Sequence, residues 1–158
     1  MKSKDQLPII GWREWVSLPD LGIKSIKSKI DTGARSSAIH AFDIRPFFRE
    51  GKQKVHFKVH PYQKNSSKTI TAEAYVIDER KVRNSGGDSE LRFVIQTTVK
   101  LKGFQWPIEL TLTNRDVMGF RMLLGRQAIR KRFLTDPGKS FLLSRRWPPG
   151  IPRKTRKK

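Results

Sequence analysis

The sequence predicts a mainly β protein, a closed or nearly closed β-barrel with one short helix near the C-terminus. Three observations support this fold class. Short segments rich in aliphatic, aromatic and β-branched residues recur along the chain, and several alternate polar and apolar residues as half-buried strands do. Gly, Pro, Asn and Asp separate these segments at turn positions. Only one stretch, around residue 130, has apolar residues at helical spacing.

The first half of the chain is expected to form strands joined by tight turns. Residues 9–18 are rich in aromatic and β-branched residues, and residues 18–22 supply a turn. Residues 23–30 carry isoleucines three and four positions apart, which fits neither a strand period nor a helix period. Residues 37–44 alternate polar and apolar side chains, and Pro46 is expected to break that strand.

The second half continues in the same way. Residues 54–59 alternate strictly, and residues 69–77 and 91–101 form the next two expected strands. Residues 78–90 between them are expected to form a loop. A strand over 104–113 then follows a tight hairpin at Lys102–Gly103.

The predicted helix covers residues 125–134, where Ile129 and Phe133 lie four apart and Arg and Lys point outward. Residues 140–143 could add a closing strand. This organisation predicts one domain over 7–144, with tails at 1–6 and 145–158.

The chain is strongly basic. Its 34 Lys and Arg residues and 14 Asp and Glu residues give a net charge of +20. Residues 145–158 hold seven of the basic residues and no acidic one, so the remainder keeps a charge of +13. Such a field attracts polyanions: nucleic acid, an anionic membrane surface or an acidic polypeptide. The Pro-rich C-terminal tail is expected to be disordered, and it either stays solvated or contacts nucleic acid or the ribosome.

Several classes of function find no support in the sequence. No apolar run is long enough to cross a membrane, and no signal peptide is recognisable. The absence of cysteine removes thiol chemistry and fits a cytoplasmic protein. His40, His56 and His60 are a poor ligand set without a nearby carboxylate pair, and residues 137–140 lack the first glycine of a phosphate-binding loop. We therefore expect no metal and no cofactor.

The candidate chemistry lies in residues 30–37, which read IDTGARSS. A turn is the ordinary interpretation of Asp, Thr and Gly in succession. The alternative is an Asp31 carboxylate that faces a second one across a cleft. Two carboxylates a few Å apart hold one proton between them, so that one acts as base on water and the other donates to a carbonyl oxygen.

Two motifs resemble those of the retropepsins. Residues 31–34, DTGA, resemble the active-site signature, and residues 122–129, MLLGRQAI, resemble the second signature. Over roughly residues 7–143 the chain more closely resembles a bacterial and archaeal family with a retropepsin-like aspartic peptidase fold. Its members are often labelled ATP-dependent zinc proteases and occur beside, or fused to, the ligase that adds glutamates to a ribosomal protein. The residues above support neither zinc nor ATP.

The resemblance implies roles for the residues of the first motif. Asp31 corresponds to the catalytic aspartate, Thr32 and Gly33 to residues that brace it, and Ala34 to the start of the loop that lines the substrate. Arg35 and Ser36 continue that loop, in the cleft or as its support. In viral retropepsins an Asp stands at the position of Arg35.

The resemblance also assigns the second motif and a flap. Gly125 and Arg126 match the Gly-Arg pair before the helix. With Arg35 in place of Asp, either Arg126 has another partner or the substrate cleft is more positive. Residues 78–90 occupy the position of the flap that closes over substrate. Its expected tip consists of four small or polar residues, Asn84, Ser85, Gly86 and Gly87.

Two functions remain open at this point. The chain has a single DTG, so aspartic catalysis requires a homodimer with one Asp31 from each chain. The first function is therefore a dimeric aspartic endopeptidase for acidic or glutamate-rich peptides. The alternative is a non-catalytic basic module that binds acidic polypeptide or RNA. Trp12, Trp15 and Trp106 could stack with bases, although their places within strands favour the core.

Overall fold

The computed structural model describes residues 6–62, 68–83, 86–117 and 119–151. The first half of the chain forms six strands and one 3-10 turn. These are β1 (Ile9–Gly11), β2 (Arg13–Leu18), η2 (Pro19–Leu21), β3 (Ile23–Asp31), β4 (Ser37–His40), β5 (Phe42–Arg49) and β6 (Lys52–Val59). The second half contains β7 (Ile70–Arg83), β8 (Ser89–Leu101), β9 (Phe104–Thr113), β10 (Met122–Gly125), α1 (Arg126–Ile129) and β11 (Leu134–Asp136).

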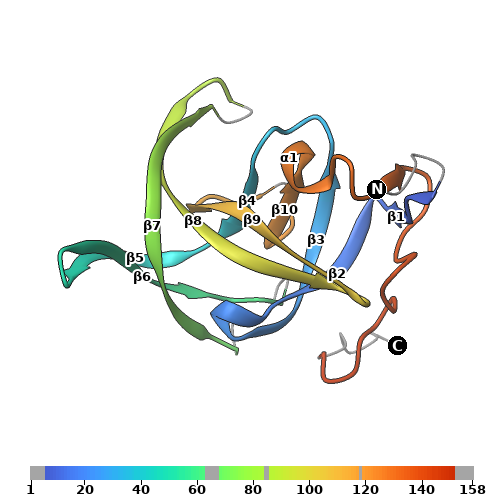
Figure 1. The fold of residues 1–158 in the computed structure, drawn as a ribbon, viewed down its shortest axis with the longest axis horizontal. Helices are drawn as coiled ribbons and strands as arrows, with labels where there is room; N and C mark the ends of the chain where they lie inside the picture. Colours follow the sequence, from blue (N-terminus) through green and yellow to red (C-terminus); the bar gives the residue numbers. More distant parts are fainter. Residues whose placement is uncertain (1–5, 63–67, 84–85, 118, 152–158) are drawn as a thin grey trace, which may run out of the picture.

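The strands form a closed barrel, as the sequence predicts. Six neighbouring strands run in the order β2-β3-β10-β4-β9-β8, and a pairing of β2 with β8 through Ser17 and Lys100 closes the ring. The sheet continues past β8 through β7 and β6 to β5, and the β5–β6 hairpin projects from the barrel at the left of Figure 1. A separate parallel pair of β1 and β11 lies on the other side.

The alternating apolar residues form one hydrophobic core, which includes residues of the barrel and of the strands that continue the sheet. Val55, Phe57 and Val59 of β6 are all fully buried, as their alternation predicts. Trp15 and Trp106 are also buried, and the Trp106 indole donates to the carbonyl of Ala128 at 3.0 Å. Burial of these two rings agrees with a place in the core and removes them as stacking surfaces for RNA.

Two strand predictions in the first half need correction. Residues 23–30 form part of β3, and their irregular spacing arises because the pairing of β2 with β3 shifts register between Val16 and Leu18. Pro46 does not end its strand but pairs with Val55 inside β5. The structure tolerates this proline because β5 is the edge strand of the sheet, where one side has no neighbouring strand.

The predictions near the C-terminus also need correction. Helix α1 covers only four residues, because Arg130 leaves the helical conformation and Lys131 adopts a positive φ of 65°. Residues 140–143 form no strand. Phe141 has a φ of 55°, and the N–H groups of the next three residues donate to the buried carboxylate of Glu14 instead of to a sheet.

Contacts with the barrel continue beyond the predicted domain boundary at residue 144. The Trp15 indole donates to the carbonyl of Arg146 at 3.1 Å. The ring of Trp147 donates to the carbonyl of Ile151 at 2.9 Å. The segment 145–151 therefore contacts β2 through Arg146 and is held within itself between Trp147 and Ile151. The rest of the predicted tail, 152–158, and the predicted N-terminal tail up to residue 5 lie outside the described residues.

Candidate active site

The two sequence motifs meet in the barrel wall. Strand β10 runs parallel to β3 and pairs Leu124 with Ile30 and Gly125 with Asp31. On its other side β10 pairs antiparallel with β4. The end of β3, the loop 32–36 and the start of α1 are therefore neighbours, although the two motifs are far apart in the sequence.

Asp31 begins a tight loop that its own carboxylate helps to hold. The Gly33 N–H donates to Asp31 Oδ1 at 3.0 Å, and the Ala34 N–H donates to the Asp31 carbonyl at 3.2 Å. The carbonyls of Ala34 and Arg35 then accept from the N–H groups of Arg126 and Gln127, at 2.6 and 3.2 Å. The first turn of α1 therefore fixes the loop from behind.

Gly125 permits this close approach. A Cβ atom at this position would lie 2.4 Å from the Ser36 carbonyl oxygen and 2.8 Å from that of Ala34. Both contacts are with backbone, which cannot rotate away as a flexible side chain does. The Gly125 N–H donates to the hydroxyl of Ser37 at 3.1 Å. This buried contact could not be predicted from the sequence.

Arg126 finds a partner that the sequence did not reveal. Its Nη1 donates to the Thr32 carbonyl at 3.1 Å, so the arginine bridges the tip of the Asp31 loop to α1. The Thr32 side chain is exposed and lines a smaller cavity of about 300 Å³ beside Arg126. No described residue accepts or donates a hydrogen bond with its hydroxyl.

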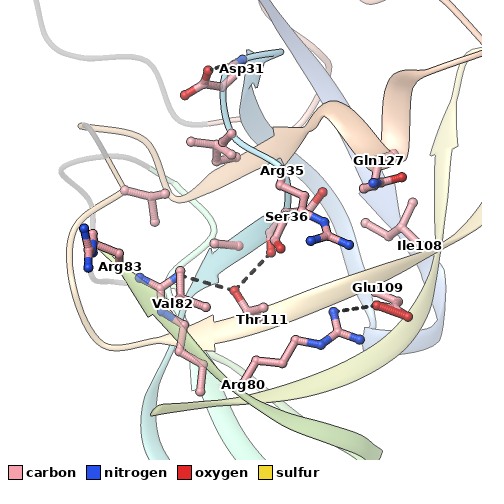
Figure 2. Close-up of a pocket in the computed structure, with 18 of the residues that line it drawn as sticks. Asp31, Arg35, Ser36, Arg80, Val82, Arg83, Ile108, Glu109, Thr111 and Gln127 are labelled. Atoms are coloured by element: carbon pink, nitrogen blue, oxygen red, sulfur yellow. Dashed lines mark hydrogen bonds and ion pairs between the residues drawn. The ribbon is translucent and has the colours of Figure 1, made fainter. Parts of the chain in front are cut away.

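A large open cavity of about 1290 Å³ adjoins the loop. Asp31, Ala34, Arg35 and Ser36 line one side. The end of β7 lines the opposite side, and Figure 2 shows Arg80, Val82 and Arg83 facing the loop across the cavity. Ile108, Glu109 and Thr111 of β9 contribute to the floor.

The cavity has an excess of positive charge. Five cations and three carboxylates line it: Arg35, Arg80, Lys81, Arg83 and Arg92 against Asp31, Glu109 and Asp116. Arg80 pairs with Glu109 and Asp78, both at 2.7 Å, and Arg92 pairs with Glu90 at 2.9 Å. In the described part of the chain, the other three cations have no carboxylate within ion-pair distance.

The ion pairs of Arg80 fix the base of the β7–β8 hairpin. The hydrogen bond with Arg80 holds the pKa of the Asp78 carboxyl below its usual value. Glu109, followed by Asp78, raises the pKa of Arg80 for the same reason. Because Glu109 belongs to β9, the Arg80 guanidinium joins the hairpin to the cavity floor (Figure 2). A period of two in residues 104–113 places Glu109 and Thr111 on one face, but nothing in the sequence marks Arg80 as their neighbour.

The predicted flap segment is a hairpin over most of its length. Residues 78–90 are not a loop, because β7 continues to Arg83 and β8 begins at Ser89, and the two strands pair with each other at these ends. Gly86 and Gly87 lie in the turn, and Gly87 has a φ of 90°. Asn84 and Ser85, the rest of the expected tip, lie outside the described residues. The hairpin arches above the barrel in Figure 1.

Other site classes are not built by the described residues. Within residues 6–62, 68–83, 86–117 and 119–151, no group of three or more His, Asp or Glu side chains could hold a metal ion. His40 is instead hydrogen-bonded through Nδ1 to the Arg121 guanidinium at 2.9 Å. In the same part of the chain, no helix has the length and apolar character required to span a bilayer.

The chain is similar to part of several curated proteins. It is 50% identical over 135 residues to a protein named probable alpha-L-glutamate ligase from Shewanella pealeana, with 85% of this chain and 30% of that protein covered. A protein of the same name from Desulfotalea psychrophila is 51% identical over 129 residues, with 82% and 28% covered. The chain thus spans less than a third of the length of these curated relatives.

A solved structure and a family model agree with the fold. The crystal structure of protein Lpg0085 of unknown function from Legionella pneumophila subsp. pneumophila str. Philadelphia 1 superimposes with a TM-score of 0.70 at 28% identity, and the match covers 87% of this chain and 98% of that one. The family model described as "Retropepsin-like aspartic endopeptidase RimB" matches residues 9–146, which include the Asp31 loop, the cavity walls and α1. The chain therefore belongs to the RimB-like family of retropepsin-like aspartic endopeptidases.

Proposed function

We propose that the protein is an aspartic endopeptidase that works as a homodimer, with one Asp31 from each subunit. The observation that carries this proposal is the position of Asp31. It ends β3 at the rim of a large open cavity, in a loop that α1 holds rigidly. Among the described residues, no hydrogen bond joins its carboxylate to a second carboxylate, so the dyad requires another chain.

The geometry leaves part of Asp31 available for chemistry. Oδ1 accepts from the Gly33 N–H, whereas Oδ2 has no hydrogen-bond partner in the described part of the chain. When two such carboxylates face each other, repulsion keeps one proton between them. One carboxylate then removes a proton from water as the oxygen attacks the peptide carbonyl, and the other donates its proton to the carbonyl oxygen.

A two-fold axis close to Asp31 would bring the two loops together. Thr32 and Gly33 are both exposed at this tip, so a partner loop can approach without displacing a buried side chain. The free Thr32 hydroxyl is then available to the partner backbone. The same contact would bury the tip and exclude bulk solvent from around the dyad and its attacking water.

Acidic peptides are the substrate class that the cavity favours. Arg35, Lys81 and Arg83 offer positive charge to a substrate, since they have no carboxylate partner in the described residues. The curated relatives, in which a domain similar to this chain makes up about 30% of the length, are named for glutamate ligation. A peptidase that removes glutamates would act on the product of such a ligase, which supports a glutamate-rich substrate.

The test compares wild type with Asp31→Asn on two peptides that differ only in a tail of six glutamates or six glutamines. Asn is nearly isosteric with Asp but cannot act as a base, so cleavage should disappear while the melting temperature stays close to wild type. Wild type should cleave the glutamate peptide faster, and Arg35→Gln should reduce this preference. Equal cleavage by the Asp31→Asn protein would refute aspartic catalysis.

A further inference from the structure

The arm formed by β5, β6 and β7 has a solvent-facing surface that the proposed peptidase does not use. The strand pairing shows which residues lie on this surface. Lys54 of β6 pairs with Phe47 of β5 and with Tyr75 of β7, and directly paired residues point to the same face of a sheet. The reverse face carries the buried Val55 and Phe57. We call the outward surface the arm face.

Two aromatic rings lie at the centre of the arm face, Tyr75 exposed and Phe47 half-buried. The Tyr75 side chain is 52% exposed, although a large ring on a three-stranded sheet would gain from burial. Phe47 lies in the same cross-strand row, two strands away, which separates the two rings by about 10 Å. The row Phe47–Lys54–Tyr75 therefore alternates aromatic, cation and aromatic groups.

Cations surround these rings. Lys54 Nζ lies 4.7 Å from the centre of the Tyr75 ring and Lys52 Nζ lies 5.8 Å from it, while the Arg49 guanidinium is 5.3 Å from Phe47. Arg45 and Lys58 complete the set of five cations on this face.

Two carboxylates, Glu73 and Asp43, partly balance the five cations. The Glu73 pairs are long, 3.7 Å to Arg49 and 3.9 Å to Lys54, and the Arg49 side chain is 56% exposed. The long, exposed pair between Arg49 and Glu73 contributes little to stability, so a phosphate can compete for Arg49 at low cost. The face keeps an excess of positive charge with aromatic rings at its centre.

We propose that the arm face binds single-stranded RNA. Bases would stack on Tyr75 and Phe47, and the phosphates would lie against Arg49 and Lys52, which is how sequence-tolerant single-strand binding works. An acidic peptide would use the same cations but has no planar group that needs an aromatic ring to stack on. The arm projects from the side of the barrel opposite β1 and away from β3, the strand that ends at Asp31 (Figure 1).

The test measures binding of a fluorescein-labelled 12-nucleotide oligoadenylate by fluorescence anisotropy over a range of salt concentrations. Tyr75→Leu keeps apolar bulk but removes the ring, and should weaken binding about tenfold, the loss expected for one stacked base. The double variant Arg49→Gln/Lys52→Gln should lower the slope of log K against log salt by about 1.4, or about 0.7 for each lost phosphate contact. The matched control Lys100→Gln/Arg130→Gln removes the same charge elsewhere on the surface.

The full chain is used throughout, so that the basic residues 152–158 contribute equally to every variant. The control should reduce binding much less than the arm variants. Equal losses in control and arm variants, or an unchanged affinity in Tyr75→Leu, would overturn the proposal. So would a Tyr75→Leu effect on a hexaglutamate peptide but not on RNA, because the arm face would then be a peptide site. Asp31→Asn should bind RNA as wild type does, which separates this inference from the proposed peptidase.

Discussion

The close approach of β10 to the Asp31 loop predicts that Gly125→Ala damages both stability and the site. The added methyl group would lie 2.4 Å from the Ser36 carbonyl oxygen, whereas ordinary contacts begin near 3.4 Å. The loop and β10 must therefore separate by about 1 Å, and overpacking of this kind typically costs about 1–3 kcal/mol. The separation also strains the 2.6 Å hydrogen bond from Arg126 N–H to the Ala34 carbonyl, whose loss adds about 1 kcal/mol.

The expected loss is thus about 2–4 kcal/mol, which corresponds to a decrease in melting temperature of roughly 5–15 °C for a chain of this length. Urea unfolding followed by tryptophan fluorescence measures it, because Trp15 and Trp106 are buried. Peptide cleavage should decrease by about 100-fold at temperatures where the variant is folded, since a shift of 1 Å displaces the Asp31 loop.

Gly103→Ala is the matched control. Gly103 lies in the β8–β9 turn without a positive φ, and an added Cβ meets nothing within 4 Å. This variant should keep wild-type stability, or gain up to about 1 kcal/mol because the unfolded chain loses freedom. A Gly125→Ala protein as stable as Gly103→Ala would refute the packing argument.

Two further predictions concern buried polar groups. Glu14→Gln should destabilise the fold by about 3–5 kcal/mol. Both carboxylate oxygens of Glu14 accept hydrogen bonds from N–H or O–H donors, and the amide nitrogen that would replace one of them cannot accept. The exposed control Glu79→Gln should change the free energy of unfolding by less than about 0.5 kcal/mol. Burial, followed by the charge of Arg121, holds the pKa of His40 below 6.5. The unfolded chain therefore takes up this proton first as the pH falls, so His40 contributes stability above about pH 6.5 that is lost below it. Urea unfolding between about pH 7.5 and pH 5.5 should show a smaller decrease in His40→Gln than in wild type, and an equal decrease in both would contradict the assignment.

The barrel could be predicted from the sequence where local patterns determine burial. Residues 54–59 and 104–113 alternate because one face of each strand packs in the core, and the Lys102–Gly103 turn joins Leu101 directly to Phe104. Residues 23–30 could not be assigned in the same way. Ser28 is fully buried between Ile26 and Ile30, so a small polar residue occupies a core position there, and the register shift between β2 and β3 breaks the alternation between Ile23 and Ile26.

The candidate site was less predictable, because long-range contacts build it. The DTG motif identifies Asp31, and MLLGRQAI identifies its neighbour, but neither shows that Arg126 bonds to the Thr32 carbonyl. The extension of β7 and β8 into a hairpin was missed, because residues 78–83 are mostly charged and carry no apolar alternation. The hydrogen bonds that the N–H groups of residues 142–144 donate to Glu14 could not be predicted from the sequence, because a single glutamate in a strand usually faces solvent.

Mixing two proteins shows whether Asp31 of both subunits is needed in one active site. Wild type and Asp31→Asn are equilibrated at increasing ratios and constant total concentration, with the dimer fraction followed by sedimentation, and cleavage is then measured. If each active unit needs Asp31 from both chains, activity follows the square of the wild-type fraction and falls to about a quarter in an equal mixture. A linear decrease to about half, or full activity from a protein that stays monomeric, would show that one Asp31 suffices and would contradict the account.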